Sequence, residues 1–305
     1  MDNPLLLPPG TQVVTRNDVP QTEGRPGHPK GSVGIITKLP VDADHAYCVR
    51  FPDGNQAFLK RDELAIRKLV HRQALEEAAS LLEEYDLYQH VIYRCVMGSR
   101  AYGLNVDGSD TDRRGVYLPP ADMQWSLFGV PEQLESKDTE ECYWELQKFI
   151  VLALKNNPNI LECLYSPIVE TVTEIGQKLL DIKGIFLSKM IYQTYNGYAM
   201  SQFKKMEGDL RNNGEIKLKH AMHLIRLLLC GLTALKEHRI PVDVEEHRSD
   251  LLAIRNGEIP WEDINNWRLK LHADFEKAYK QTSLPERPNY EAANTFLIQA
   301  RRSVI

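Results

Sequence analysis

Several features that would define a secreted, membrane or disulfide-rich protein are scarce or absent in this sequence. The chain has only five cysteines, far apart and without a CxxC pair, so buried reduced thiols are expected rather than a disulfide framework. The first residues, MDNPLLLPPG, lack the basic and apolar regions of a signal peptide. The longest apolar run, LLLCGLTAL from Leu227, is too short to cross a bilayer. We therefore expect a cytoplasmic protein without a membrane partner.

An excess of basic charge is also missing. The chain has 37 Lys and Arg against 42 Asp and Glu, a formal net charge of −5. This balance gives no whole-chain reason to expect nucleic-acid binding, although it is compatible with a local basic patch. What is present is a globular composition: 305 residues, 43% of them hydrophobic, enough for one large domain or two ordinary ones.

Local patterns divide the chain into three parts. Residues 1–66 alternate short β-forming runs with turn signals such as PDGN, which predicts a small antiparallel barrel that resembles SH3-like domains. Such a barrel is either a binding module for a nucleic acid or protein, or a packing and oligomerisation module. Residues 67–165 combine a helix over 68–86 with strand-like runs, HVIYRCVM, DRRGVYLP and a third near EECYW, and residues 166–305 have mostly helical spacing. The predicted fold class is α+β, with a mixed sheet in the central part and a helical C-terminal domain.

The stretch GSRAYGLNVDGSDTDRRGVYLP, which begins at Gly98, holds the candidate site. After a strand, Gly98 allows a phosphate to approach the backbone, and Ser99 adds a hydroxyl donor at the start of a short helix. Asp110 and Asp112 are one residue apart, so on a strand their carboxylates share a face. Two such carboxylates repel each other unless a cation lies between them, and Mg²⁺ prefers carboxylate and phosphate oxygens. The alternative, an ordinary polar turn at DGSD, is disfavoured by the order of strand, glycine turn, helix and strand.

These residues resemble a known superfamily. Gly98-Ser99 followed by Asp110-x-Asp112 is similar to the signature of the nucleotidyltransferases of the DNA polymerase beta superfamily. The segments LQKF, NNPNILECLYSP and KHAMHLIR extend the likeness to predicted bacterial and phage nucleotidyltransferases. The resemblance implies a polymerase-beta-like core and two Mg²⁺ ions, or Mn²⁺, that assist transfer of a nucleoside monophosphate from an NTP such as ATP. The N-terminal barrel lies outside it.

The same resemblance implies a third acidic residue on a neighbouring strand, which binds metal or takes the proton of the acceptor. Counted back from the KF pair, this position falls on Glu140, where the family usually has aspartate. Glu140 shares strand parity with Cys142 and Trp144, and Asp138 would face the same way on a longer strand. Glu140, Asp138 and Glu141 all stay open, with Glu140 preferred.

Basic residues supply further candidate nucleotide ligands. Arg100 follows the Gly-Ser pair, and guanidinium groups bind phosphate well. In KHAMHLIR, a spacing of three gathers His220, His223 and Arg226 loosely on one helix face beside Lys219. The resemblance implies phosphate or substrate contact there, and a solvated amphipathic face is the alternative. The HxxH spacing alone does not indicate zinc, because no cysteine or acidic partner follows at ligand spacing. The segment RNGE, at 255–258, has no role that the sequence reveals.

Together, the residues and the resemblance predict a Mg²⁺-dependent nucleotidyltransferase. Gly98 and Ser99 hold the phosphates, Asp110 and Asp112 bind the metals, and Glu140 completes the site. The acceptor hydroxyl belongs to an RNA end, a protein or a small molecule. Three other interpretations are a catalytically silent nucleotide-binding regulator, a nucleic-acid-binding module led by the barrel, and a metal-dependent hydrolase. The intact Gly-Ser and Asp-x-Asp pairs disfavour the first, the acidic net charge the second, and the Gly-Ser turn the third.

Overall fold

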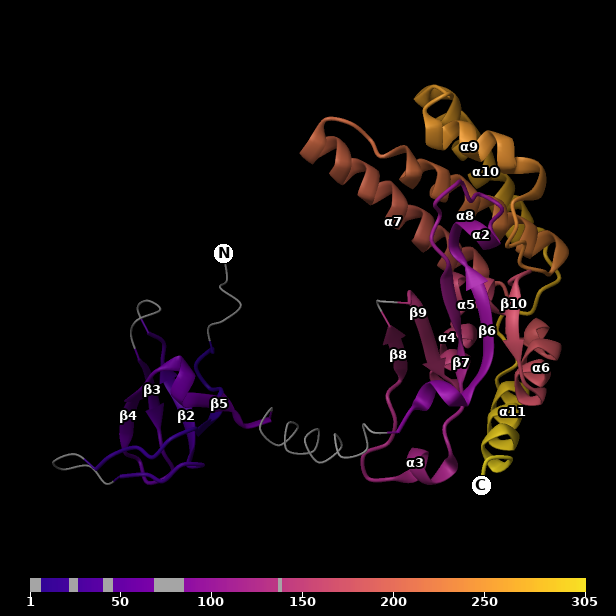
Figure 1. Ribbon diagram of the computed structural model, residues 1–305. Helices are drawn as coiled ribbons and strands as arrows, with labels where there is room; N and C mark the ends of the chain where they lie inside the picture. The colour runs from indigo at the N-terminus through magenta and orange to yellow at the C-terminus, as the bar shows by residue number, and fades with distance from the viewer. Residues whose placement is uncertain (1–6, 22–26, 41–45, 69–84, 137–138) are drawn as a thin grey trace. The chain divides into compact units, whose positions relative to one another are not determined.

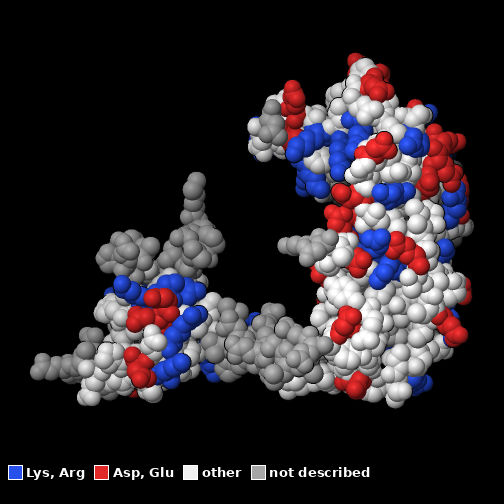
Figure 2. Space-filling view, viewed as in Figure 1, with Lys and Arg blue, Asp and Glu red and all other residues white. Residues whose placement is uncertain are grey.

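The chain forms two compact units, Met1–Tyr85 and Asp86–Ile305. The computed structural model describes residues 7–21, 27–40, 46–68, 85–136 and 139–305 (Figure 1), and Figure 2 colours the charged residues among them. The helix predicted over residues 68–86 lies almost entirely outside the described residues.

The first unit is an antiparallel sheet. Its strands are β1 (Gln12–Thr15), β2 (Val33–Lys38), β3 (Tyr47–Arg50), β4 (Gln56–Leu59) and β5 (Leu64–Ile66), with a 3-10 helix at Arg61–Glu63. They pair in the order β4-β3-β2-β1-β5. Alternate residues of β1 and β2 are buried, among them Val13 and Ile36, so one face of these strands carries the core. The antiparallel sheet is present as predicted, and its closure into an SH3-like barrel stays a prediction.

The second unit is built on a mixed five-stranded sheet. Its strands are β6 (Val91–Met97), β7 (Asp112–Tyr117), β8 (Gln133–Ser136), β9 (Glu141–Glu145) and β10 (Val169–Val172). They lie in the order β10-β6-β7-β9-β8, and within this sheet the β7–β9 pair is parallel while the others are antiparallel. The sheet and the helices around it confirm the predicted α+β class. β8 and β10 were not predicted, because β10 is exposed along its whole length and β8 buries a single residue, Leu134, so neither shows clear alternation.

Helices lie on and beside this sheet. They are α2 (Gly98–Ala101), α3 (Ala121–Trp125), α4 (Leu146–Leu154), α5 (Pro158–Leu164), α6 (Glu174–Asp181) and α11 (Tyr290–Arg302). In Figure 1, α4 and α5 lie behind the strands, and they contact β6, β7 and β9. The side chain of Asn157 caps α5 by accepting the amide of Asn159, and Pro158 occupies the first helical position. The NPN run therefore begins a helix.

The remaining helices form a bundle around α8. They are α7 (Met190–Asn213), α8 (Leu218–Glu237), α9 (Arg248–Asn256) and α10 (Trp261–Gln281). The second unit also has 3-10 helices at Leu87–His90, which precedes β6, and at Lys183–Phe186 and Glu245–His247. In the described part of the chain, α8 alone is long and apolar enough to cross a membrane, with a mean hydropathy of 1.3. Of that stretch, 61% is buried inside the fold, where α7, α9 and α10 pack against the helix. Core packing accounts for its apolar residues.

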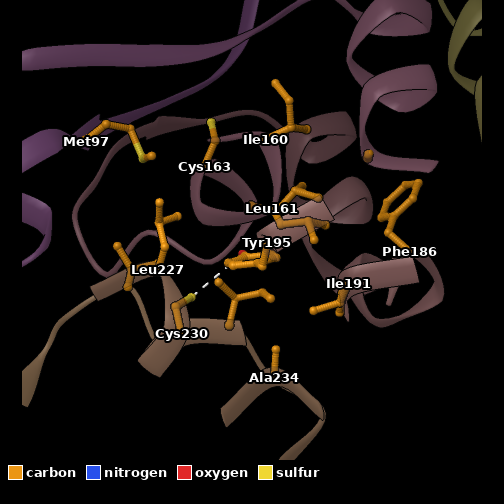
Figure 3. Close-up of a cluster of buried hydrophobic side chains, with 14 of the residues drawn as sticks. Met97, Ile160, Leu161, Cys163, Phe186, Ile191, Tyr195, Leu227, Cys230 and Ala234 are labelled. Atoms are coloured by element: carbon orange, nitrogen blue, oxygen red, sulfur yellow. Dashed lines mark hydrogen bonds between the residues drawn. The ribbon is translucent and has the colours of Figure 1, made fainter. Parts of the chain in front are cut away.

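A continuous hydrophobic core joins the bundle to the sheet. Figure 3 shows Leu161 of α5 beside Tyr195 of α7, which a dashed line joins to Cys230 of α8, and the Cys230 sulfur lies 3.7 Å from the Tyr195 hydroxyl. β10, which lies beyond the predicted border at residue 165, pairs with β6. The structure therefore does not divide at residue 165, because the bundle buries its apolar face on the helices that cover the sheet. The five cysteines are free and buried, as predicted.

A chain that begins at Lys68 is expected to fold without the first unit, because each unit has its own hydrophobic core. All four tryptophans lie in the second unit, so their fluorescence during urea unfolding reports on that unit alone. We expect the shortened chain to keep the midpoint of the full chain in a cooperative transition. Loss of that transition would mean that the second unit needs the first one to fold.

Candidate active site

The Gly-Ser pair forms a tight turn at the end of β6. β6 ends at Met97, and α2 follows at once as a four-residue turn. Gly98 has a φ of 68°, and a Cβ at this position would overlap Oδ2 of Asp112. Any side chain there would strain the backbone and displace the carboxylate. Glycine at position 98 therefore allows the Gly-Ser turn and Asp112 to lie in contact.

The two aspartates lie where β7 begins. Asp112 is the first residue of β7, whereas Asp110 lies in the loop just before the strand, so the prediction that both belong to the strand is wrong for Asp110. Arg100 holds this loop: its Nε donates to the carbonyl of Asp110 at 3.2 Å, and its Nη2 donates to the carbonyl of Ser109 at 2.9 Å. On the strand, Oδ1 of Asp112 pairs with Nη2 of Arg114 at 3.1 Å. Arg100, predicted to bind nucleotide, thus uses its guanidinium on the backbone that carries Asp110.

A cavity of about 480 Å³ joins the aspartates to helices of the bundle. Its lining comes from the Gly-Ser turn, the loop before β7, β7 itself, α8 and α9: Gly98, Ser99, Tyr102, Leu104, Val106, Asp107, Gly108, Ser109, Asp110, Asp112, Lys219, Met222, His223 and Arg255. Six of the residues predicted for the site meet here, namely Gly98, Ser99, Asp110, Asp112, Lys219 and His223. Three others, Arg100, Glu140 and Arg226, do not belong to this lining.

Glu140 lies beside the aspartates along the sheet. β7 and β9 pair in parallel with Arg113 beside Glu141, so residue 140 is level with Asp112. The amide of Arg113 donates to the carbonyl of Glu140 at 3.1 Å. Arg114 contacts both positions, since its Nη1 donates to the Glu140 carbonyl at 2.8 Å and its Nη2 contacts Asp112. The strand register thus brings Glu140 close to Asp112, although its side chain is exposed.

The backbone of Glu140 differs from the prediction. Its φ is 53°, in the left-handed region, and β9 begins only at the next residue. The prediction assumed that the Glu140 side chain points to the same face of the strand as Cys142 and Trp144. This assumption fails, because a left-handed residue interrupts the alternation of side chains along a strand. Of the two competitors, Glu141 lies on β9 at the neighbouring register position, and Asp138 lies outside the described residues.

The polar residues of KHAMHLIR do not share one face. His220 Nδ1 lies 2.8 Å from Oδ2 of Asp209 on α7, His223 lines the cavity, and Arg226 is buried behind it. Residues three apart on an α-helix are offset by roughly 60° around its axis, so His220 and Arg226, two such steps apart, point in directions that differ by roughly 120°. The helix therefore points one residue at α7, one at the cavity and one at the core.

His223 is uncharged at neutral pH. Its pKa is lowered to about 3, first by burial and then by the nearby positive charges of Arg226, Lys219, His220 and Lys205. An ordinary histidine has a pKa of 6.5, whereas the lowered pKa of His223 means that its ring loses the second proton well below pH 7. A neutral imidazole offers the cavity one hydrogen-bond donor and one acceptor.

Arg226 belongs to a buried network under the Gly-Ser loop. Its Nη1 lies 2.8 Å from Oε1 of Glu162, a carboxylate with no exposed surface. The hydroxyl of Tyr102 donates to the other oxygen of Glu162 at 2.8 Å, and the Arg226 guanidinium lies 3.8 Å from the centre of the Tyr102 ring. Tyr102 directly follows α2, so the network anchors the loop that carries Ser99. The structure does not place Arg226 as a nucleotide ligand, because its charge is balanced by Glu162.

Backbone contacts hold the same loop from the bundle side. The amide of Val244 donates to the carbonyl of Tyr102 at 3.1 Å, and Nε of Arg248 donates to the carbonyl of Gly103 at 2.6 Å. Gly103 has a φ of 68°, and a Cβ there would lie 2.8 Å from Oδ1 of Asp243. The Gly-Ser turn is thus positioned by the helical part of the chain as well as by β6.

Sequence reasoning missed several of these residues. Glu162 was detectable, because it is the one charged residue in NILECLYS and buried carboxylates are rare unless they are paired. Asp107 and Arg255 line the cavity, but no local pattern marks either, since they reach it only through the packing of loop and helices. Val244 and Arg248 donate hydrogen bonds to backbone carbonyls of the loop, and neither residue type by itself predicts such a contact.

The oxygen ligands in the cavity fit a hard divalent cation. Within the described residues, no three His, Cys, Asp or Glu side chains form a group that could hold a metal ion. Asp110, Asp112 and Ser99 nevertheless supply two carboxylates and a hydroxyl to one cavity. Mg²⁺ characteristically uses one or two carboxylates and completes its shell with water and substrate phosphate, so this donor set suits it.

A mixed sheet, a Gly-Ser turn beside an aspartate-bearing strand and a helical bundle at the cavity agree with the polymerase-beta-like core that the sequence motifs resemble. Residues 70–299 match the RlaP family, described as "RNA repair pathway DNA polymerase beta family". The match covers well over half of the chain, and the chain belongs to this family. The resemblance inferred from Gly98-Ser99 and Asp110-x-Asp112 is confirmed. The matched range begins after the first unit's sheet, so that sheet has no counterpart in the match.

A relative among curated proteins carries no assigned function. It is the "Uncharacterized protein YcgL" of Bacillus subtilis (strain 168), which is 26% identical to this chain over 178 residues. The alignment covers 56% of this chain and 66% of the relative, slightly less than two thirds of its length. At the level of the family, the match points to nucleotidyltransferase activity.

Proposed function

We propose that the protein transfers a nucleoside monophosphate from an NTP to an acceptor hydroxyl, assisted by Mg²⁺ or Mn²⁺, and releases pyrophosphate. The observation that supports this most directly is the cavity in which Ser99, Asp110 and Asp112 meet the basic side chain of Lys219. Acidic and basic groups in one cavity suit a substrate that brings both a cation and phosphates. The family match supports the same class of reaction.

In this proposal Asp110 and Asp112 bind the metal, and Gly98 and Ser99 lie against the β- and γ-phosphates. A bound divalent ion would neutralise charge on the phosphate oxygens and on the leaving pyrophosphate. Asp112 is oriented beforehand by its contact with Gly98 and by its ion pair with Arg114. Lys219 and His223 contribute a cation and a neutral hydrogen-bonding group to the nucleotide.

The reaction replaces a phosphoanhydride bond of the NTP with a phosphoester bond to the acceptor. The acceptor oxygen forms a bond to the α-phosphorus, the bond from that phosphorus to the bridging oxygen breaks, and pyrophosphate leaves with the electron pair. The proton of the acceptor hydroxyl goes to a base, for which we propose Glu140 because the register places it level with Asp112.

We infer that the acceptor is an RNA end, because the description of the matched family names an RNA repair pathway. The test is to incubate the chain with each α-labelled NTP, Mg²⁺ or Mn²⁺, and total RNA. Incorporation of label into a product that nuclease digests, together with release of pyrophosphate, would support the proposal. Labelled product that protease digests would identify a protein as the acceptor instead. NTP binding without transfer to any acceptor would instead support a nucleotide-binding regulator.

Glu140→Gln is expected to lower kcat of transfer by roughly a hundredfold to ten-thousandfold, with a much smaller change in NTP binding. Glutamine keeps the size of the side chain and removes the carboxylate that would take the proton. Single-turnover rates and NTP titration separate the two effects. Glu141→Gln, one position further along the chain, is the matched control. A wild-type rate for Glu140→Gln would exclude Glu140 as the base and direct the search to Asp138.

A further inference from the structure

The end of α9 lies against the beginning of α8, and this packing carries Arg255 into the cavity. α9 ends at Asn256, and Gly257 follows it with a φ of 80°. A Cβ on Gly257 would lie only 3.2 Å from Cδ1 of Leu218, the first residue of α8, so the two helix ends are in close contact. Arg255 and Lys219 consequently line the same cavity from two helices. The segment RNGE thus combines a cavity residue with the glycine that ends its helix.

Arg255 differs from the other arginines around the site because its guanidinium pairs with no carboxylate or carbonyl among the residues that the structure describes. Arg100 binds loop carbonyls, Arg114 pairs with Asp112, and Arg226 pairs with Glu162. In the part of the chain that the structure describes, Arg255 makes no ion pair and no hydrogen bond, and the same is true of Lys219. Arg255 is also half-buried as a residue, so its side chain is partly held by the surrounding helices while its charge stays available to a ligand in the cavity.

We propose that Arg255, together with Lys219, binds a phosphate group of the substrate from the helical side of the cavity. A guanidinium presents paired N–H donors that match two phosphate oxygens, and an ammonium group adds a second positive charge. Asp110 and Asp112 cannot bind phosphate directly, since like charges repel, so the cavity needs cations elsewhere in its lining. The identity of the substrate rests on the proposed function, whereas the phosphate site rests on the geometry of Arg255 and Lys219.

The phosphate has two chemical sources that this site would bind alike. One is the triphosphate of the nucleotide, and the other is a terminal phosphate on an RNA acceptor. Three probes distinguish them by calorimetric titration: inorganic tripolyphosphate, and an oligoribonucleotide with and without terminal phosphates. The variants are Arg255→Ala, Arg255→Lys and, as matched control, Arg287→Ala, which removes an exposed arginine outside the cavity.

Arg255→Ala is expected to weaken binding of a phosphate probe by about tenfold to a hundredfold, Arg255→Lys by less, and Arg287→Ala not at all. A loss confined to tripolyphosphate assigns Arg255 to the nucleotide, and a loss confined to the phosphorylated oligoribonucleotide assigns it to the acceptor. Unchanged binding of both probes by Arg255→Ala, or failure of the wild-type chain to bind either at millimolar concentration, would overturn the proposal. Phosphate binding through Arg255 in a chain that transfers no nucleotide would overturn only the proposed function. Tryptophan fluorescence confirms in each case that the variant is folded.

Discussion

Replacement of Asp110 and Asp112 by asparagine is expected to reduce nucleotide transfer on the order of a thousandfold or more, while the chain stays folded. The two carboxylates are the acidic ligands that we propose for the metal, and an amide is a far weaker ligand for a hard cation. Stability should change little, because Asp110 is exposed and the Asp112–Arg114 pair is partly exposed, with 40% of the Asp112 side chain accessible. Ion pairs of this kind contribute about 0–1 kcal/mol. Transfer of label from NTP measures the first effect, and urea unfolding measures the second.

Asp250→Asn provides the matched control for this prediction. Asp250 is an exposed aspartate at the start of α9 and lies outside the cavity lining, so the same chemical change there should leave transfer at the wild-type rate. A folded Asp110→Asn, Asp112→Asn double variant with unchanged turnover would refute the catalytic role of both residues. Loss of folding in the double variant would show that the carboxylates are needed for structure, contrary to their exposure.

Arg226→Met is expected to lower the free energy of unfolding of the second unit by about 3–5 kcal/mol. The substitution leaves the Glu162 carboxylate buried without its cation, which is the costly way to break a buried ion pair. Removing both charges in Arg226→Met, Glu162→Leu should recover part of the loss, since no buried charge is left unpaired, although the Tyr102 hydroxyl loses its acceptor. Urea unfolding followed by tryptophan fluorescence measures the effect in this unit alone, because all four tryptophans belong to it.

The exposed pair between Arg239 and Glu237 is the matched control. Its atoms approach to the same 2.8 Å, but about half of each side chain is accessible to solvent. Arg239→Met should therefore cost less than about 1 kcal/mol. If Arg226→Met costs no more than Arg239→Met, burial does not amplify the Glu162–Arg226 pair, and the network under Tyr102 does not stabilise the loop.

Much of the second unit was predictable because its signals are local. The strands β6 and β7, the turn at Gly98 and the long helices α7, α8 and α10 each appear as a continuous pattern of apolar spacing or as a turn residue with a specific φ. The burial of the five cysteines was also predictable from their spacing and from the absence of a CxxC pair. Such features depend on interactions within a few residues, so the order of amino acids suffices to determine them.

The residues around the cavity show where local patterns stop being sufficient. Ser99, Asp112 and His223 line one cavity, and the prediction for His223 came from the family resemblance, not from its spacing on the helix. Helical spacing could not predict the role of Arg226, because that role depends on the carboxylate of Glu162, a residue 64 positions away in the chain. Periodicity identifies which side of a helix is polar or apolar, but not which element covers that side.

By itself, the sequence determined that this protein has an α+β core with a Gly-Ser turn followed by a strand that begins at the second aspartate of the Asp-x-Asp pair, because these features follow from local conformational preference. Only the tertiary structure decided how the neighbouring charges are used. It buried Arg226 against Glu162, turned Glu140 into a left-handed conformation beside Asp112, and placed Arg255 at the cavity with no ion-pair partner among the described residues. The physical reason is that a charge acquires its role from groups brought near it by packing, and those groups come from helices and strands distant in the chain.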